Sequence, residues 1–149
     1  MSHARETIRK AIVTSITGLT TTGTRVYSNY MYPYEDSTLP NLSLYVAHEP
    51  EEVADDLEMG THDLRSLPFR VSARAKANSD LDDSLDDMCA EVETAIIGNA
   101  ALAAYVKTIQ LVSTTIEMDN EGEKPVGVAR MEWVIIYRVN RTAPTTPVQ

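Results

Sequence analysis

The chain has 149 residues, a formal net charge of −9 at pH 7 and a hydrophobic fraction of 43%, which suits one domain built around a single core. The negative charge argues against a free-standing nucleic-acid binder, although it is compatible with an assembly that surrounds DNA without gripping it. The single cysteine, Cys89, excludes an intramolecular disulfide and a multi-cysteine metal site. The longest apolar run, Trp133 to Tyr137, is too short to span a bilayer, and the N-terminus has no signal-type apolar region, so we expect a soluble, intracellular protein.

The N-terminal part of the chain predicts one helix and two strands. Four apolar residues recur at helical spacing: Ile8, Ile12, Ile16 and Leu19. We therefore expect a helix that begins at Ser2, its N-cap, and ends near Thr17. Two glycines after it allow a turn into a short strand at 25–27, and alternating apolar residues predict a second strand at 41–46.

An acidic stretch follows the second predicted strand. Its carboxylates crowd into eight residues and comprise Glu51, Glu52, Asp55, Asp56 and Glu58. Large apolar residues, Leu57 and Met59, stand among them, whereas a compact connection would be shorter. We expect a hairpin arm over about 48–66 that protrudes from the sheet and becomes ordered on a partner; a solvated loop is the alternative interpretation.

The apolar period changes from two to three or four between residues 67 and 97. Alternate residues of 67–76 are apolar, while Arg70, Arg74 and Lys76 share the opposite face of the predicted strand. Residues 81–97 then form an amphipathic helix with acidic residues on its remaining surface. Solvation or cross-strand pairing with Glu132 explains the basic stripe. The other interpretations are contact with an acidic surface of a neighbouring subunit and proximity to DNA.

The C-terminal part predicts two more strands after a short turn at 100–105. The first covers 107–118, and the second is apolar on one face throughout 129–139. Because Val134 and Ile136 make its other face apolar too, we expect the second strand to be central and covered on both sides at its middle. Residues 142–149 contain two prolines and no periodicity, which predicts a flexible tail.

These elements predict an α+β fold within a single domain over 1–141. Two helices pack on a mixed or antiparallel sheet of four to five strands, giving a two-layer sandwich with a protruding hairpin arm.

The sequence offers no evident constellation for catalysis or metal binding. None of its three histidines accompanies a G-x-S-x-G elbow, and Cys89 sits on a helical stripe. The acidic residues match no zinc or EF-hand spacing, and the phosphate-loop and dinucleotide glycine patterns are missing. We therefore expect a non-enzymatic protein without a metal or a cofactor.

The order and spacing of several segments resemble phage tail terminator proteins, also called minor tail protein U-like or tail completion proteins. The resemblance covers most of residues 4–141 and is carried by 8–12 with Leu19, by 22–27, by Leu39-Pro40 before a strand, by 81–86, by 90–93 and by 132–138. It implies a virion protein of the tail, made in the host cytoplasm, whose copies form a ring, typically a hexamer, on the head-proximal end of the tail tube. Such a ring stops polymerisation of the tail tube protein and offers a surface to the head–tail connector protein. Genomic DNA passes through the hole without specific binding.

A closed ring of identical subunits needs a heterologous interface, in which one patch meets a different patch. An acidic arm on one subunit meeting a basic sheet face on the next would supply it. The interface candidates are therefore Arg70, Arg74, Lys76, Asp55, Asp56, Leu57 and Met59. Two other functions remain open at this point: a head–tail connector or neck adaptor with the same small fold, and a small-molecule-binding regulatory domain.

Overall fold

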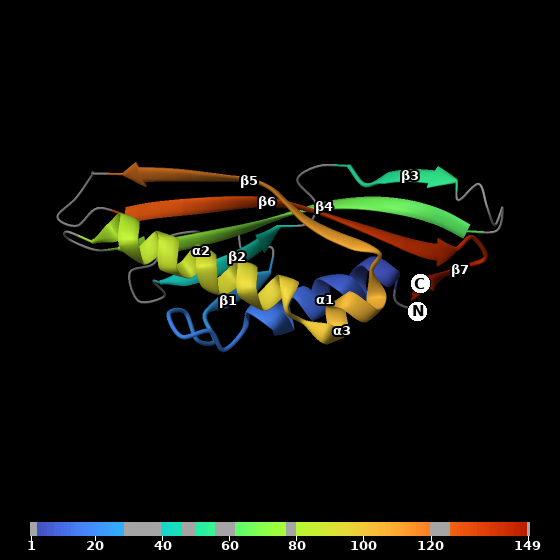
Figure 1. Ribbon diagram of the computed structural model, residues 1–149, viewed down its shortest axis with the longest axis horizontal. Helices are drawn as coiled ribbons and strands as arrows, with labels where there is room; N and C mark the ends of the chain where they lie inside the picture. Colours follow the sequence, from blue (N-terminus) through green and yellow to red (C-terminus); the bar gives the residue numbers. More distant parts are fainter. Residues whose placement is uncertain are drawn as a thin grey trace.

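The computed structural model describes residues 3–28, 40–45, 50–55, 62–76, 80–119 and 126–148. In this part of the chain there are three helices, α1 (Ala4–Ile16), α2 (Leu81–Ile97) and α3 (Ala100–Tyr105). The seven strands are β1 (Val26–Ser28), β2 (Asn41–Tyr45), β3 (Glu52–Asp55), β4 (His62–Lys76), β5 (Thr108–Asp119), β6 (Val126–Asn140) and β7 (Ala143–Val148). The helices form one layer and the sheet the other (Figure 1), which confirms the predicted α+β class.

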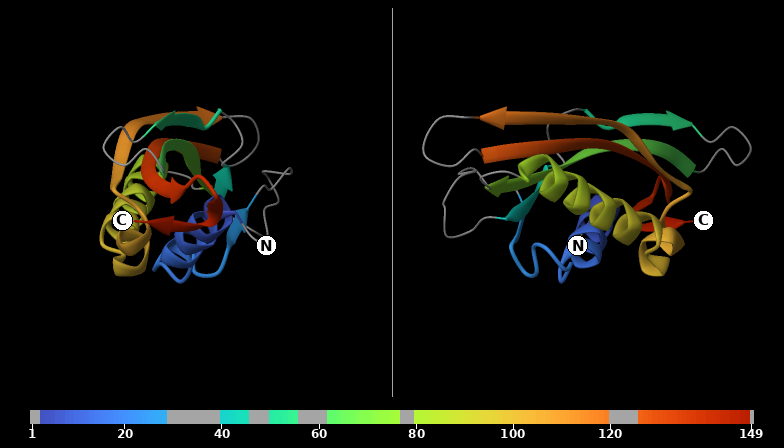
Figure 2. Two further views of the ribbon diagram at one scale, coloured as in Figure 1. Left: turned by 90° about the vertical axis from the view of Figure 1, so that its right-hand side faces the viewer. Right: turned by 60° about the vertical axis from the view of Figure 1, so that its left-hand side comes forward.

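Two long strands, β4 and β6, form the centre of the sheet. They pair antiparallel over their full lengths, from His62 opposite Asn140 to Lys76 opposite Val126. The strand order is β1-β2-β4-β6-β5, and only β1 and β2 are parallel neighbours, so the sheet is mixed. β3 and β5 lie on the side of the molecule farthest from the helices (Figures 1 and 2).

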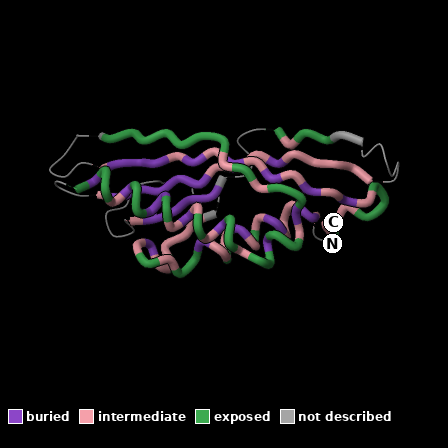
Figure 3. The backbone as a smooth tube through the Cα atoms, in the orientation of Figure 1, coloured by how far each residue is buried: buried purple, intermediate pink, exposed green. Residues whose placement is uncertain are grey.

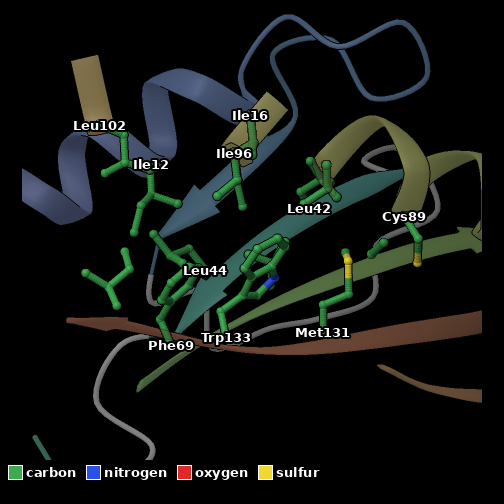
Figure 4. Close-up of a cluster of buried hydrophobic side chains, with 14 of the residues drawn as sticks. Ile12, Ile16, Leu42, Leu44, Phe69, Cys89, Ile96, Leu102, Met131 and Trp133 are labelled. Carbon is green, nitrogen blue, oxygen red and sulfur yellow. The ribbon is translucent and has the colours of Figure 1, made fainter. Parts of the chain in front are cut away.

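The core lies between the helices and the inner face of the sheet. α1 contributes Ile8, Ile12 and Ile16, and α2 contributes Leu85, Met88, Val92 and Ile96, all at most 1% exposed. On the sheet, Phe69 and Trp133 stack with their ring centroids 5.9 Å apart (Figure 4). The predicted apolar face of β6 is buried throughout 129–139, whereas Val134 and Ile136 on its other face are only half-buried. β6 is thus a central strand, as predicted, but only its helix-facing side is fully buried.

Three local differences from the sequence prediction have physical reasons. The N-cap of α1 is His3, whose Nδ1 accepts a hydrogen bond from the backbone N–H of Arg5 at 3.1 Å. Residues 100–105 form helix α3 instead of a turn, because Asn99 caps them by accepting from the backbone N–H of Leu102 at 2.8 Å. The flexible tail predicted for 142–149 is wrong for 143–148, which form β7; its prolines are tolerated because β7 is an edge strand.

The described part of the arm belongs to the sheet. β3 and the start of β4 make the expected antiparallel hairpin, with Asp55 opposite Asp63. Residues 62–66 of β4 also pair with 136–140 of β6, so this half of the hairpin continues the sheet instead of branching from it. The remainder of the arm, 48–49 and 56–61, lies outside the described residues.

Candidate functional site

The described residues contain no group of three or more His, Cys, Asp or Glu side chains that could hold a metal ion. None of the helices described in this chain has the length and apolar character to cross a membrane. Cys89 is a free, buried thiol on α2. Burial, helped by the nearby carboxylates of Glu93 and Asp86, raises the pKa of Cys89 to about 11. A thiol with so high a pKa is a poor nucleophile at neutral pH.

The three basic interface candidates share the outer face of β4, as predicted, but their environments differ. Arg70 donates to the carboxylate of Glu132 on β6 at 2.6 Å, which is the cross-strand pair that the sequence suggested. Arg74 is only 6% exposed, and its Nη1 donates to Ser43 Oγ on β2 at 2.7 Å. Its interpretation as an exposed cation is therefore wrong, because its own subunit buries it. Lys76, at the end of β4, is half-buried.

The four acidic or apolar candidates of the arm fall at the edge of the described residues. Asp55 ends β3, where only its backbone is described. Asp56, Leu57 and Met59 lie outside the described residues. The part that these residues and the basic stripe take in assembly stays a prediction.

Glu51, immediately before β3, is the centre of a polar network at one end of the sheet. Its Oε1 accepts from Arg5 Nη1 at 2.7 Å and from Arg65 Nη1 at 3.2 Å. Its Oε2 accepts from the Tyr137 hydroxyl at 2.7 Å. The Glu51 side chain is 10% exposed and that of Arg65 15%. The network thus joins α1, β4 and β6 to the segment that leads into β3.

Two titratable groups of this Glu51 network have shifted pKa values. Burial and the hydrogen bond to the Glu51 carboxylate raise the pKa of Tyr137 far above its ordinary value. Burial, together with the positive charges of Arg5 and Arg65, lowers the pKa of His3. At neutral pH Tyr137 therefore keeps its proton and donates, while His3 is neutral and can accept. Both oxygens of Glu51 are engaged, so the arrangement suits an anchor for the hairpin better than a general base.

The sequence interpretation missed this network because it placed Glu51 among the solvated acids of the arm. One signal was present. Tyr137 stands in the otherwise apolar row of β6 that forms the core, and a buried tyrosine hydroxyl requires a hydrogen-bond partner.

An outer groove of about 340 Å³ lies on the sheet face opposite the helices. It is lined by Pro50, Glu52, Ser66, Pro68, Val112, Ser113, Glu132, Trp133 and Val134. In the described residues, β2 ends with Tyr45 opposite Arg70 and β3 starts with Glu52 opposite Ser66, so 67–69 form a local edge of β4. Pro68, which has no amide hydrogen to donate, is tolerated there. A bulge in β5 at Val112 shapes the opposite wall.

The comparisons with known proteins place the chain in no family. No family model and no curated protein match it. A matching solved chain belongs to the virion of a native gene transfer agent (GTA) particle. It shares 15% identity over 90% of this chain and 92% of that chain, with a TM-score of 0.49. A similarity at this level assigns no function.

Proposed function

We propose that this chain is a structural virion protein, a tail terminator whose copies close into a ring on the head-proximal end of a phage tail tube. The ring would stop addition of the tube protein and present a surface to the head–tail connector, with the genome passing through. The ring and its place come from the sequence resemblance to tail terminator proteins. The structural support comes from surfaces that favour self-association.

The observation that carries the proposal is the exposed edge strand β5. It is 12 residues long, and within the described residues no strand pairs with its outer edge. Its exposed apolar side chains are Val112, Ile116 and Met118, at 61%, 42% and 47% exposure. Figure 3 shows most of this strand exposed, and residues 112–118 are exposed without interruption. Monomeric proteins usually shield such edges, whereas assembling subunits use them as interfaces.

The charge of the chain favours specific closure over random association. A net charge of −9 makes copies repel one another on average. Contact between copies is then stable only where apolar or oppositely charged patches match. The Phe69–Trp133 stack and the Glu51 network join the strands that carry such patches to one packed core.

The experiment that tests the proposal measures tail length in particles assembled with and without this chain. Loss of a terminator leaves polymerisation of the tube unchecked, so we expect overlong tails. Tails of normal length that remain detached from heads would instead identify a connector or neck adaptor. Attached tails of normal length would refute both functions.

A surface variant links that phenotype to β5. Ile116→Glu places a charge on the exposed edge, and we expect it to reproduce the overlong tails while the monomer stays folded. Thr20→Glu adds the same charge at an exposed position in the loop after α1 and serves as the matched control. Equal effects of the two substitutions would show that β5 is not the interface.

A further inference from the structure

Two of the exposed apolar residues in the described part of the chain lie on opposite sides of the sheet. Ile97, 58% exposed, is the last residue of α2 and lies in the helical layer. Val112, 61% exposed, lies in the bulge of β5 and lines the outer groove. All three helices cover the same face of the sheet (Figures 1 and 2), so the groove and the end of α2 point away from each other. Two such patches on one subunit suit a head-to-tail contact.

We infer that the outer groove of one subunit receives the α2–α3 corner, Ile97 to Ala101, of the next copy of this chain. Ile97 enters between Pro68, Val112 and Val134 and covers the exposed bulge. The inference rests on the proposed function, because it names the two surfaces that would join subunits in the ring.

The shape of the corner supports this contact. Ile97 is followed by Gly98 and Asn99, and α3 then begins with two exposed alanines. Because its neighbours are so short, Ile97 is the bulkiest apolar side chain of the corner. A branched apolar side chain is well matched to an open hollow of about 340 Å³ that has proline and valine walls. The alanines leave room for the rims of the groove to approach.

Lys10 beside the corner and Glu52 at the groove carry opposite charges. Glu52 is exposed at the rim of the groove. Lys10 of α1 shares a small hollow with Asn99 and Ala101 of the corner, so its side chain lies beside the docking surface. Lys10 pairs with Glu6 at 2.6 Å, but this pair is exposed and can exchange partners at small cost. Glu93 lies one turn before Ile97, roughly 6 Å along the helix at 1.5 Å per residue, so Lys10 is the group of this surface that can pair with Glu52.

Symmetrical docking of the same surfaces is unfavourable. Groove against groove would bring Glu52 towards Glu52, and corner against corner would leave both hollows empty. The head-to-tail arrangement alone fills the groove and pairs Lys10 with Glu52.

Cysteine cross-linking tests the contact directly. The double variant I97C/V112C places one thiol in the corner and one in the groove, and oxidation should join each subunit to the next. We expect a ladder of covalent oligomers on a non-reducing gel. The single variants I97C and V112C should not give a ladder, because each offers only one reactive thiol besides the buried Cys89. I97C/D83C is the matched control, since Asp83 is also exposed but lies in the first turn of α2, outside the groove and away from β5.

The result separates the inference from the proposed function. If the wild-type protein forms rings by electron microscopy and I97C/V112C gives no ladder, the docking contact is wrong and the ring function stands. If neither the wild-type chain nor any variant associates, with or without tail tubes, the proposed function fails as well.

A charge exchange gives a second, independent readout. Lys10→Glu and Glu52→Lys should each raise the protein concentration needed for ring formation at least tenfold, and the double variant should restore it to within about threefold of wild type. Both residues are on the surface, so the monomer should stay folded. A double variant that is as defective as the two single changes combined would overturn the contact.

Discussion

Replacing Glu51 by alanine should destabilise the folded monomer by about 3 kcal/mol. The lost hydrogen bond from Tyr137 to a charged acceptor contributes about 1.5 kcal/mol. Arg65 contributes a further ~1–2 kcal/mol, less than the 3–5 kcal/mol of a fully buried pair, because it is 15% exposed and still faces Asp63 at 3.8 Å. Arg5 is 42% exposed, so its share is at most about 0.5 kcal/mol.

Urea unfolding measures this difference as a lower midpoint with an unchanged slope. For a chain of this size the loss corresponds to a melting temperature about 6–12 °C lower, at ~2–4 °C per kcal/mol. Glu52→Ala is the matched control, because Glu52 is the adjacent carboxylate and is exposed; it should change stability by less than about 0.5 kcal/mol. If Glu51→Ala and Glu52→Ala had the same stability, the network would not anchor the hairpin.

Three further outcomes follow from the same region and the core. Tyr137→Phe should lower the free energy of unfolding in urea by about 1–2 kcal/mol. In a Glu51→Ala background it should lower it no further, because both substitutions remove the same hydrogen bond; additive losses would contradict this. The pKa of His3 is lowered by folding, so the unfolded chain binds more protons near pH 6 and stability falls as the pH drops below about 6.5. His3→Asn, which keeps an N-cap acceptor for the Arg5 N–H, should lessen the stability difference between pH 7.5 and 5.5, and an unchanged difference would refute that role. Cys89 should react with iodoacetamide at pH 8 about 100-fold more slowly in the native than in the unfolded chain, because a pKa of about 11 leaves little thiolate; equal rates would show that the thiol is accessible.

Local periodicity was sufficient to predict the regular elements that build the core. The inner faces of β4 and β6 and the buried stripe of α2 follow directly from apolar residues at spacings of two and of three or four. The Arg70–Glu132 pair could also be foreseen, because both side chains stand on predicted outer faces of strands that became neighbours.

The remaining features depend on which elements meet, and local patterns do not carry that information. The pattern of its own strand predicts that Arg74 is on the surface. In the fold β2 lies beside β4, and Arg74 is buried and donates to Ser43. In the sequence, Glu51 is one of several neighbouring acidic residues and nothing distinguishes it. In the structure it accepts hydrogen bonds from Arg5, Arg65 and Tyr137, which belong to three different elements. β7 has no periodicity of its own and forms because the end of β6 offers an unpaired edge.

Negative-stain electron microscopy of the purified protein, alone and mixed with isolated tail tubes, tests the central claim most directly. The account predicts closed rings of this chain seated at one end of each tube, with tube growth stopped at that end. Monomers that leave both ends of the tubes bare and growing would contradict it.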